Sequence, residues 1–238
     1  LDWCGDNQMY LILDLHGAPG GQGHDANISD YDPSKPSLWE SAENRRKTVA
    51  LWARLAQRYA DKPWMGGYDL INEPNWDLPG GTLLRQLYQQ ITTAIRAVDA
   101  HHMIIIEGNW FANDYTGLTP PWDNNMVYSF HKYWNFNTQG SIDWMKTIRN
   151  TYNVPIWLGE SGENSNTWFT EAIGLCESNK IGWSWWPVKK DGINNVLEVT
   201  AGRNYDNLIS FWETGSPVMN SEQAFAAVME FSNNHRIE

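Results

Sequence analysis

Six short apolar runs alternate with segments of helical periodicity along this chain, and the alternation leaves few folds open. Such runs, each followed by an amphipathic helix, are typical of βα units that build a parallel sheet. Most of the runs are almost continuously apolar, as expected for strands that are covered on both faces. The predicted strands are Met9–His16, Gly67–Glu73, Met103–Glu107, Met126–His131, Pro155–Glu160 and Ile181–Trp186.

The segments between these runs carry apolar residues at helical spacing. In Thr82–Asp99, for example, Leu84, Leu87 and Tyr88 fall on one face of the predicted helix. No repeat or linker interrupts the pattern, so we expect residues 1–238 to form one domain, a TIM-barrel-like (β/α) barrel of the α/β class with six visible βα units. The predicted helices are Ala42–Tyr59, Thr82–Asp99, Ser141–Tyr152, Thr167–Asn179 and Ser221–Asn233.

Two long segments rich in Gly, Pro, Asn and Asp follow predicted strands. Gly17–Leu38 follows the first strand, and residues 187–217 follow the last one. Because the carboxyl ends of parallel strands meet at one edge of a sheet, we expect both segments to be loops around the same mouth.

Charge and cysteine content exclude several classes of partner. The formal net charge of −11 argues against a nucleic acid or an anionic membrane, and no apolar stretch reaches the length of a membrane span. Cys4 and Cys176 form no metal-binding or redox motif, so we expect both to be buried or free rather than bridged. The first residue is Leu1 rather than Met, which indicates a mature or trimmed segment and leads us to expect a secreted or periplasmic protein.

Fifteen tryptophans are an unusually high number for a chain of 238 residues. Some must belong to the core, but five stand in polar stretches rich in Gly, Pro and Asn, where a buried indole is less expected. A flat aromatic face suits the apolar face of a pyranose ring. These five are therefore candidates for a sugar-binding groove, with core packing as the alternative for each: Trp39, Trp76, Trp110, Trp122 and Trp134.

Glu73 and Glu160 each end a predicted strand, in the runs Gly-Gly-Tyr-Asp-Leu-Ile-Asn-Glu-Pro and Val-Pro-Ile-Trp-Leu-Gly-Glu-Ser. Hydrolysis of a glycosidic bond needs one carboxyl group to protonate the leaving oxygen and another to attack the anomeric carbon or to activate water. Strand ends of an α/β barrel can bring two such groups to one substrate. The alternative is that both are surface residues in turns.

The other predicted strands also end in polar side chains. In chain order, the strand-end motifs are Asp14-Leu15-His16, Asn72-Glu73-Pro74, Glu107-Gly108-Asn109, His131-Lys132-Tyr133, Gly159-Glu160-Ser161 and Trp183-Ser184-Trp185-Trp186. Asn-Glu-Pro alone is a modest signal, but followed by His-x-Tyr, a strand-end Glu and a final Trp it becomes specific. This order resembles that of glycoside hydrolase family 5, which contains many cellulases and related β-glycanases, and the resemblance covers nearly the whole chain.

The resemblance implies a role for each matching residue. Glu73 matches the acid/base and Glu160 the nucleophile of a retaining mechanism. Asn72 matches the residue that hydrogen-bonds the 2-hydroxyl group of the sugar. His131 and Tyr133 match the pair beside the scissile bond, in which the Tyr hydroxyl orients the nucleophile.

Further substrate contacts are expected from aromatic residues and a histidine. Trp186 matches the indole that stacks under the reacting sugar, and His16 matches a histidine that contacts substrate. We also expect Trp76 and Trp110 to bind substrate. The implied activity is cleavage of internal β-1,4-glucosidic bonds in cellulose or a related β-glucan, with no cofactor. The alternatives are a β-1,3-glucanase, a mannanase, a xyloglucanase or a non-catalytic carbohydrate-binding barrel.

Other assignments of the same residues stay open. Glu163 lies three residues after Glu160 and is the alternative nucleophile, and Glu107 is expected to contact the catalytic groups rather than the substrate. Several histidines and an aspartate could suggest the centre of a metal-dependent hydrolase. Their spacing matches no compact ligand motif, so we expect no metal. These residues are His16, His24, Asp25 and His131.

The chain departs from the family pattern at its beginning. The family barrel has eight units, and Met9–His16 resembles the third strand, so the first two units have no counterpart. The arginine that the family carries near the end of its second strand also has no counterpart in this chain. Met9–His16 and Ile181–Trp186 would then be open edges, which sheet proteins avoid. We expect a smaller closed barrel of six units or closure by a second chain, as in a homodimer; a segment of a longer polypeptide is the third possibility.

Overall fold

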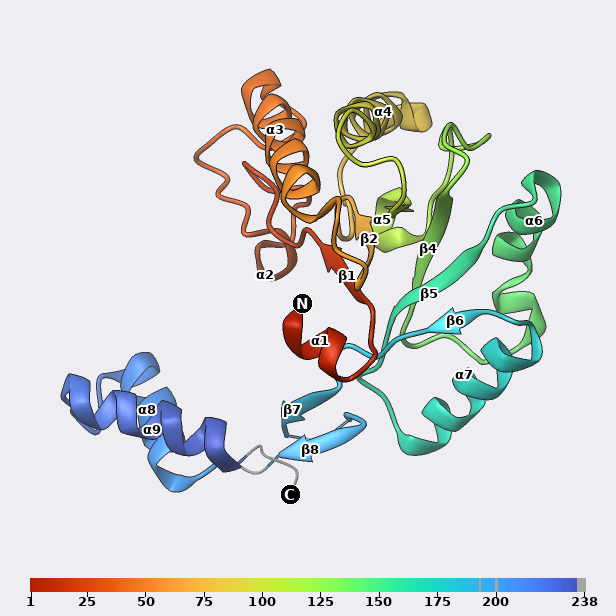
Figure 1. The fold of residues 1–238 in the computed structure, drawn as a ribbon. Helices are drawn as coiled ribbons and strands as arrows, with labels where there is room; N and C mark the ends of the chain where they lie inside the picture. The colour runs from red at the N-terminus through yellow and green to blue at the C-terminus, as the bar shows by residue number, and fades with distance from the viewer. Residues whose placement is uncertain (193, 200, 235–238) are drawn as a thin grey trace.

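The computed structural model describes residues 1–192, 194–199 and 201–234. Its centre is a parallel sheet in which six strands follow one another in chain order, as the sequence predicts. Figure 1 shows that the sheet is curled and open on one side. The predicted α/β fold with six βα strands in a barrel-like curl is thus confirmed. The strands are β1 (Leu11–Asp14), β2 (Met65–Asp69), β3 (Met103–Glu107), β4 (Met126–Lys132), β5 (Ile156–Ser161) and β6 (Gly182–Trp183).

Helices cover the outer face of this sheet (Figure 1). Four long ones connect successive strands, and each lies within a few residues of its predicted bounds: α3 (Ala42–Tyr59), α4 (Thr82–Arg96), α6 (Asp143–Tyr152) and α7 (Asn166–Ser178). Shorter elements lie at the chain start and in the loops: α1 (Asp2–Asp6), α2 (Ala26–Ser29), η1 (Pro79–Gly81), α5 (Asn109–Ala112) and η2 (Gln139–Ser141).

Local sequence explains where the long helices begin and which face they bury. The side chain of Ser41 accepts a hydrogen bond from the backbone N–H of Asn44 at the start of α3, and Ser165 does the same for α7. Such caps satisfy amide groups that have no partner within the helix. On α4, the predicted apolar stripe that includes Leu84 and Leu87 is buried against the sheet. Burial of such a side chain contributes roughly 1.5–3 kcal/mol.

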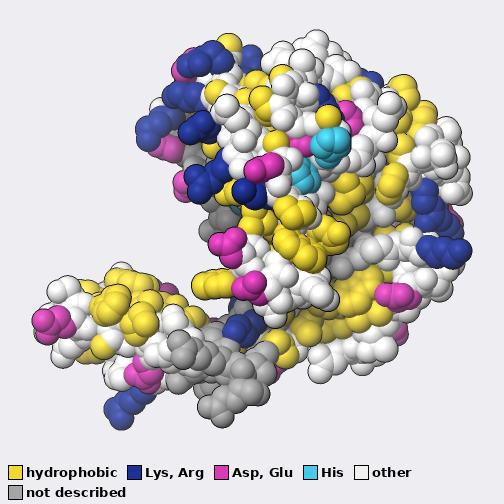
Figure 2. Space-filling model, in the orientation of Figure 1, with side chains coloured by type: hydrophobic (Ala, Val, Ile, Leu, Met, Phe, Trp, Pro, Cys, Tyr) yellow, Lys and Arg dark blue, Asp and Glu magenta, His cyan; other side chains and the backbone are white. Residues whose placement is uncertain are grey.

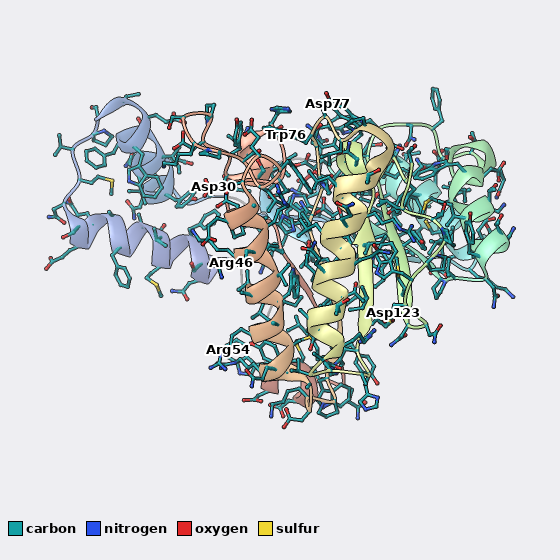
Figure 3. All side chains as sticks on the ribbon, turned by 90° about the horizontal axis from the view of Figure 1, so that it is seen from above. Asp30, Arg46, Arg54, Trp76, Asp77 and Asp123 are labelled. Carbon is teal, nitrogen blue, oxygen red and sulfur yellow. The ribbon has the colours of Figure 1, made fainter. Side chains whose placement is uncertain are left out.

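Figure 3 shows α3 and α4 side by side. Trp76 and Asp77 lie at one end of this helix pair, whereas Arg54 and Asp123 lie at the other. Trp76 follows β2 in the chain, so its end of the molecule is the carboxyl edge of the parallel sheet. Ligand sites of α/β barrels are found at this edge.

The sheet does not close on itself. β1 and β6 are its two edges, and no pairing joins them in the described part of the chain. The prediction of a closed barrel with six units is therefore wrong. The edge strands are short, four residues in β1 and two in β6, and closure needs strand number, tilt and stagger to agree. In Figure 1 the N-terminal helix α1 lies beside the gap. Closure by a second chain stays a prediction.

The segment 187–217 is not the long loop that the sequence analysis predicts. It contains β7 (Lys189–Asp191), β8 (Leu197–Val199) and α8 (Arg203–Thr214), and β7 pairs with β8 in a small parallel sheet. The Thr-Gly turn signal is the end of α8, where Gly215 takes a left-handed conformation that glycine adopts without steric cost.

The last helix, α9 (Ser221–Asn234), packs against α8, and Figure 1 shows this helix pair to one side of the curled sheet. The organisation of residues 1–238 as a single domain stays a prediction. No helix in the described residues is both long and apolar enough to span a membrane.

Candidate active site

A pocket of about 730 Å³ lies at the carboxyl edge of the sheet. Figure 2 shows histidine and acidic side chains beside hydrophobic ones on the hollowed face of the molecule. The strand-end motifs bring seven predicted site residues to the wall of this pocket: His16, Asn72, Glu73, His131, Tyr133, Glu160 and Trp186.

His131 is surrounded by three carboxylates. Its Nδ1 lies 2.7 Å from Oε1 of Glu73 and 3.5 Å from Oε2 of Glu160, and its Nε2 lies 3.2 Å from Oε1 of Glu107. Burial alone would lower the pKa of His131, but Glu107, Glu73 and Glu160 together raise it well above its usual value. The surroundings therefore favour the protonated imidazole, in which both ring nitrogens can donate to carboxylates.

Glu107 supports this arrangement from behind. It is only 1% exposed, and its Oε2 accepts a 2.6 Å hydrogen bond from the backbone N–H of Glu73. Burial raises the pKa of Glu107 to about 7, although the charge of His131 works in the opposite direction. This position matches the expectation that Glu107 contacts the catalytic groups rather than the substrate.

Glu160 lies at the end of β5 with its two oxygens in different surroundings. Oε2 accepts a 2.7 Å hydrogen bond from the hydroxyl group of Tyr133. Oε1 is buried, has no hydrogen-bond partner among the described residues and lies 3.7 Å from Nε2 of His16. Burial raises the pKa of Glu160, and the cationic His131 limits the rise. Burial together with the charge of Glu160 also raises the pKa of Tyr133, so its hydroxyl group stays a donor.

The two glutamates approach each other closely. One carboxylate oxygen of Glu73 lies within 4.8 Å of one of Glu160. Glycosidases that retain configuration hold their two carboxyl groups about 5–5.5 Å apart, and inverting enzymes hold them about 6.5–9.5 Å apart to leave room for water. The closest oxygens of the two glutamates are thus near enough to act on one glycosidic bond.

The backbone at Glu73 is strained. Its φ is +45°, in the left-handed region that a non-glycine residue rarely adopts. Strain of this kind costs on the order of 1–3 kcal/mol and persists where neighbouring contacts impose it. One such contact is the buried Gln22, whose amide donates to the carbonyl groups of His16 and Asn72 at 2.6 and 2.9 Å. Nothing in the sequence marks Gln22 as a residue of the site, because it sits among the glycines of the first long loop.

His16 and Trp186 form one side wall of the pocket. Their rings stack with centroids 4.9 Å apart and planes 17° apart. Nε2 of His16 also lies 2.7 Å from Oδ2 of Asp14. The backbone N–H of Trp186 donates to the carbonyl oxygen of Ser161 at 2.7 Å, which holds this indole beside the end of β5. Trp186 is 44% exposed, so part of its surface remains free for a ligand.

The other tryptophans are distributed differently from expectation. Trp76 and Trp110 do not line the pocket: Trp76 stacks on His24 with centroids 3.8 Å apart, and Trp110 is 49% exposed in a left-handed turn. Trp39 is buried, as the alternative of core packing predicts. Trp134 does line the pocket. A substrate-binding role for Trp76 and Trp110 stays a prediction.

Pocket residues that the sequence analysis does not assign come mainly from loops. The first long loop contributes Asp25, Asn27 and Ile28, as its predicted place at the mouth implies. None of the described residues of 187–217 lines the pocket, so the prediction that this segment also surrounds the mouth is wrong for the pocket wall. Phe111 and Asn113 come from the turn after β3. Their only sequence signal is that they follow the strand-end motif Glu107-Gly108-Asn109.

Glu163 lines the same pocket but differs from Glu160 in its surroundings. Its Oε1 lies 2.7 Å from Nζ of Lys190 and forms a partly exposed ion pair. No pocket histidine or tyrosine hydroxyl contacts it among the interactions of the described residues. The structure thus gives Glu160, rather than Glu163, the contacts expected of a reactive carboxylate.

Three groups of side chains in the described residues could place ligand atoms around a metal ion. Two of them contain Glu160: one with Asp14 and His16, and one with Glu73 and His131. In both, the imidazole already forms short contacts with a carboxylate. None of the third group, Asp14, Asp69 and Glu107, is among the residues that line the pocket. The absence of a metal requirement stays a prediction.

Comparison with known proteins gives the family of the chain. The family model described as cellulase, glycosyl hydrolase family 5, matches residues 1–192. The chain belongs to glycosyl hydrolase family 5. Among similar proteins, a β-xylosidase of Phanerodontia chrysosporium is 27% identical over 87% of this chain and 51% of that protein. Endoglucanase C of Acetivibrio thermocellus is 30% identical over 56% of this chain and 37% of that protein. The family 5 chain therefore spans about half the length, or less, of these relatives.

Solved structures show the same fold. The cellulose synthase subunit Z of Clostridioides difficile matches with a TM-score of 0.63 and 19% identity, over 96% of this family 5 chain and 77% of that one. The Thermotoga maritima Cel5A structure in complex with cellobiose matches with a TM-score of 0.60 and 18% identity, over 78% and 67%. These likenesses support the (β/α)-barrel architecture of the curled sheet.

Proposed function

We propose that this family 5 chain is a retaining glycoside hydrolase that cleaves internal β-1,4-glucosidic bonds of cellulose or a related β-glucan. The observation that carries the proposal is the approach of Glu73 to Glu160 within 4.8 Å in a pocket at the carboxyl edge of the sheet. Carboxylate oxygens this close can act on one glycosidic bond, as the acid/base and the nucleophile of retaining enzymes do.

In the first step, Glu160 attacks the anomeric carbon while Glu73, in its acid form, protonates the glycosidic oxygen. The bond between the anomeric carbon and that oxygen breaks, the shortened glucan leaves, and the sugar stays bound to Glu160 as an ester. Oε1 of Glu160 is suited to attack because Tyr133 occupies Oε2 and Oε1 has no partner among the described residues.

In the second step, Glu73 takes a proton from a water molecule, the water oxygen attacks the anomeric carbon, and Glu160 leaves as a carboxylate. Cationic His131 stabilises the negative charge that moves between the two glutamates during the cycle, because it contacts both. Asn72 is buried with its Oδ1 unpaired among the described residues, which leaves it free to bind the 2-hydroxyl group of the sugar.

The substrate is expected to be a neutral polysaccharide or oligosaccharide. Trp186 offers an exposed indole face beside Glu160, and Trp134, in the segment after β4, offers another. Stacking of sugars on such faces adds to hydrogen bonding without requiring charge. A secreted or periplasmic location and the absence of a cofactor are part of the same proposal.

A second candidate is action on β-1,3-glucan or on a β-xyloside. It is supported by the names of relatives, which include the β-xylosidase and a glucan 1,3-β-glucosidase of Candida oleophila that is 30% identical over 57% of this chain and 31% of that protein. Mannan and xyloglucan remain alternatives that differ by loop shape, and a non-catalytic sugar-binding barrel is the alternative without chemistry.

The test is release of reducing sugar from soluble β-1,4-glucan by the wild type and by Glu160→Gln, with β-1,3-glucan, mannan, xyloglucan and xylan in parallel. Activity that is lost in the variant supports both the reaction and the nucleophile, and the preferred polymer decides between the candidates. Proton NMR of the first product reports whether the anomeric configuration is retained. A wild type that binds these glucans but cleaves none of them would favour the non-catalytic alternative.

A further inference from the structure

Lys132 is a buried cation at the end of β4, next to Tyr133. The residue is 4% exposed, and burial lowers the pKa of its ammonium group to about 8. Within the described residues no carboxylate lies within ion-pair distance of Lys132. Burial of a charge without a counter-ion is costly, so a protein that keeps it must satisfy the group in another way.

The ammonium group is satisfied by the loop that follows it. Nζ donates to the carbonyl oxygen of Asn135 at 2.9 Å and to Oδ1 of Asn137 at 2.6 Å. It also lies 4.7 Å from the ring centroid of Trp168 on α7, in a cation–π contact. The side chain of Lys132 thus turns back onto residues 133–137, here called the Tyr133 loop.

The Tyr133 loop forms part of the active-site wall. Tyr133, Trp134 and Asn135 all line the pocket, and Tyr133 carries the hydroxyl group that donates to Glu160. Because Lys132 binds the loop at two of its five residues, the ammonium group restricts the paths that the backbone can take after β4. The position of the Tyr133 hydroxyl depends on that path.

Other contacts of the loop converge on the same place. Nε1 of Trp168 donates to the carbonyl oxygen of Asn135 at 3.1 Å, and Nδ2 of Asn137 donates to the carbonyl oxygen of Trp168 at 3.1 Å. Nδ2 of Asn164 donates to the carbonyl oxygen of Tyr133 at 2.9 Å. Lys132 is the member of this network that joins the end of β4, the loop and α7.

We propose that Lys132 is a positioning residue for the reaction: its ammonium group holds the Tyr133 loop so that the Tyr133 hydroxyl meets Glu160. The proposal rests on the proposed function, since it assigns Glu160 the nucleophile's role. Lys132 also lines the pocket. Direct contact with substrate is therefore the rival role, and the two roles differ in whether Lys132 acts through Tyr133.

The test is a double-mutant cycle with Lys132→Met and Tyr133→Phe, in which kcat and KM are measured on the preferred glucan. Methionine keeps the length of the side chain but removes both donated hydrogen bonds and the charge. We expect Lys132→Met to lower kcat by about tenfold to a hundredfold, the size expected for loss of a hydrogen bond to a charged group, with little change in KM. In the Tyr133→Phe background the same change should cost less than about threefold.

Lys132→Arg and Lys47→Met serve as controls. Arginine keeps a donor at the same place and should restore part of kcat, whereas Lys47 is exposed on α3, so its replacement should change neither kcat nor KM. Two results would overturn the positioning role and favour substrate contact. In one, the losses of kcat in Lys132→Met and Tyr133→Phe simply multiply in the double variant; in the other, Lys132→Met changes KM alone.

Amide hydrogen exchange of residues 133–138 tests the same idea without any turnover. Lys132→Met should exchange faster in this segment than the wild type and Lys47→Met, while exchange in α4 stays the same. If the wild type cleaves no glycan, the proposed function fails and the exchange experiment still decides whether Lys132 holds the loop. Unchanged exchange in 133–138 would refute the inference even for an active enzyme.

Discussion

Nδ1 of His131 lies 2.7 Å from Oε1 of Glu73, and the same nitrogen lies 3.5 Å from Oε2 of Glu160. One imidazole thus touches both members of the carboxylate pair, while Glu107 binds its other nitrogen. A cation placed between two glutamates can stabilise whichever of them is ionised at a given step. The cluster therefore couples the charge states of the groups to which the proposed mechanism assigns different roles.

Glu73→Gln should remove the proton donor of the reaction and keep the nucleophile Glu160 in place. Glutamine cannot protonate a leaving oxygen, so hydrolysis of β-glucan should fall by about 10²–10⁴-fold. Aryl glycosides with good leaving groups need little protonation, and their first step should be nearly unaffected. Pre-steady-state release of the aryl group measures that step directly. Equal losses on both kinds of substrate would assign Glu73 another role.

Trp186→Ala should weaken substrate binding. Its indole is 44% exposed at the pocket and stacks on His16, so its removal takes away a sugar platform without opening the core. We expect KM for glucan to rise by about threefold to tenfold, in line with about 0.5–1.5 kcal/mol for an aromatic contact. Trp212→Ala is the matched control, because this tryptophan is 62% exposed on α8 and does not line the pocket. An equal effect of both changes would contradict a specific role for Trp186.

The stability of the fold should decrease as the pH rises from about 4.5 to 7. Burial raises the pKa of Glu107 to about 7 from its usual 4.5, so the folded state keeps a proton that the unfolded chain has already released. The contribution of Glu107 to the free energy of unfolding is therefore full below pH 4.5. It decreases as the pH rises through the folded pKa of about 7. His131 acts in the same direction above pH 6.5, because its pKa is also raised.

Urea unfolding of the wild type and of Glu107→Gln at several pH values measures this effect. Glutamine does not titrate, so the variant should show a flatter dependence between pH 4.5 and 7, by on the order of 1–3 kcal/mol. Parallel curves for the two proteins would mean that Glu107 titrates normally in the folded state.

The strands and the site residues were the predictable part of this molecule. The parallel strands follow from apolar runs, and side chains at their carboxyl ends must meet at one edge, which is why Glu73, His131 and Glu160 could be grouped from the sequence alone. The sequence pattern does not predict the backbone geometry between the strands. The left-handed φ of Glu73 and the left-handed turn that brings Phe111 to the pocket are imposed by tertiary contacts, not by local preference.

Buried polar residues were missed for a related reason. Gln22 and Lys132 belong to residue types that are usually exposed, and nothing in their neighbourhood marks them as buried. Their importance depends on partners that are close only in the fold, such as the carbonyl groups of His16 and Asn72 for Gln22. The prediction of a closed six-unit barrel failed because closure depends on the length and tilt of edge strands, which apolar patterning does not specify.

Gly81→Ala should destabilise the fold. Gly81 precedes α4 with φ at +66°, and an added Cβ would lie 1.9 Å from the carbonyl oxygen of Thr116. Both the left-handed backbone and the clash with another loop oppose a side chain, so we expect a loss of about 2 kcal/mol or more in unfolding free energy. Gly140→Ala is the control, since its Cβ would meet nothing within 4 Å. Thermal unfolding of both variants measures the difference, and a Gly81→Ala protein as stable as Gly140→Ala would show that the loops at Gly81 and Thr116 do not pack as closely as the structure has them.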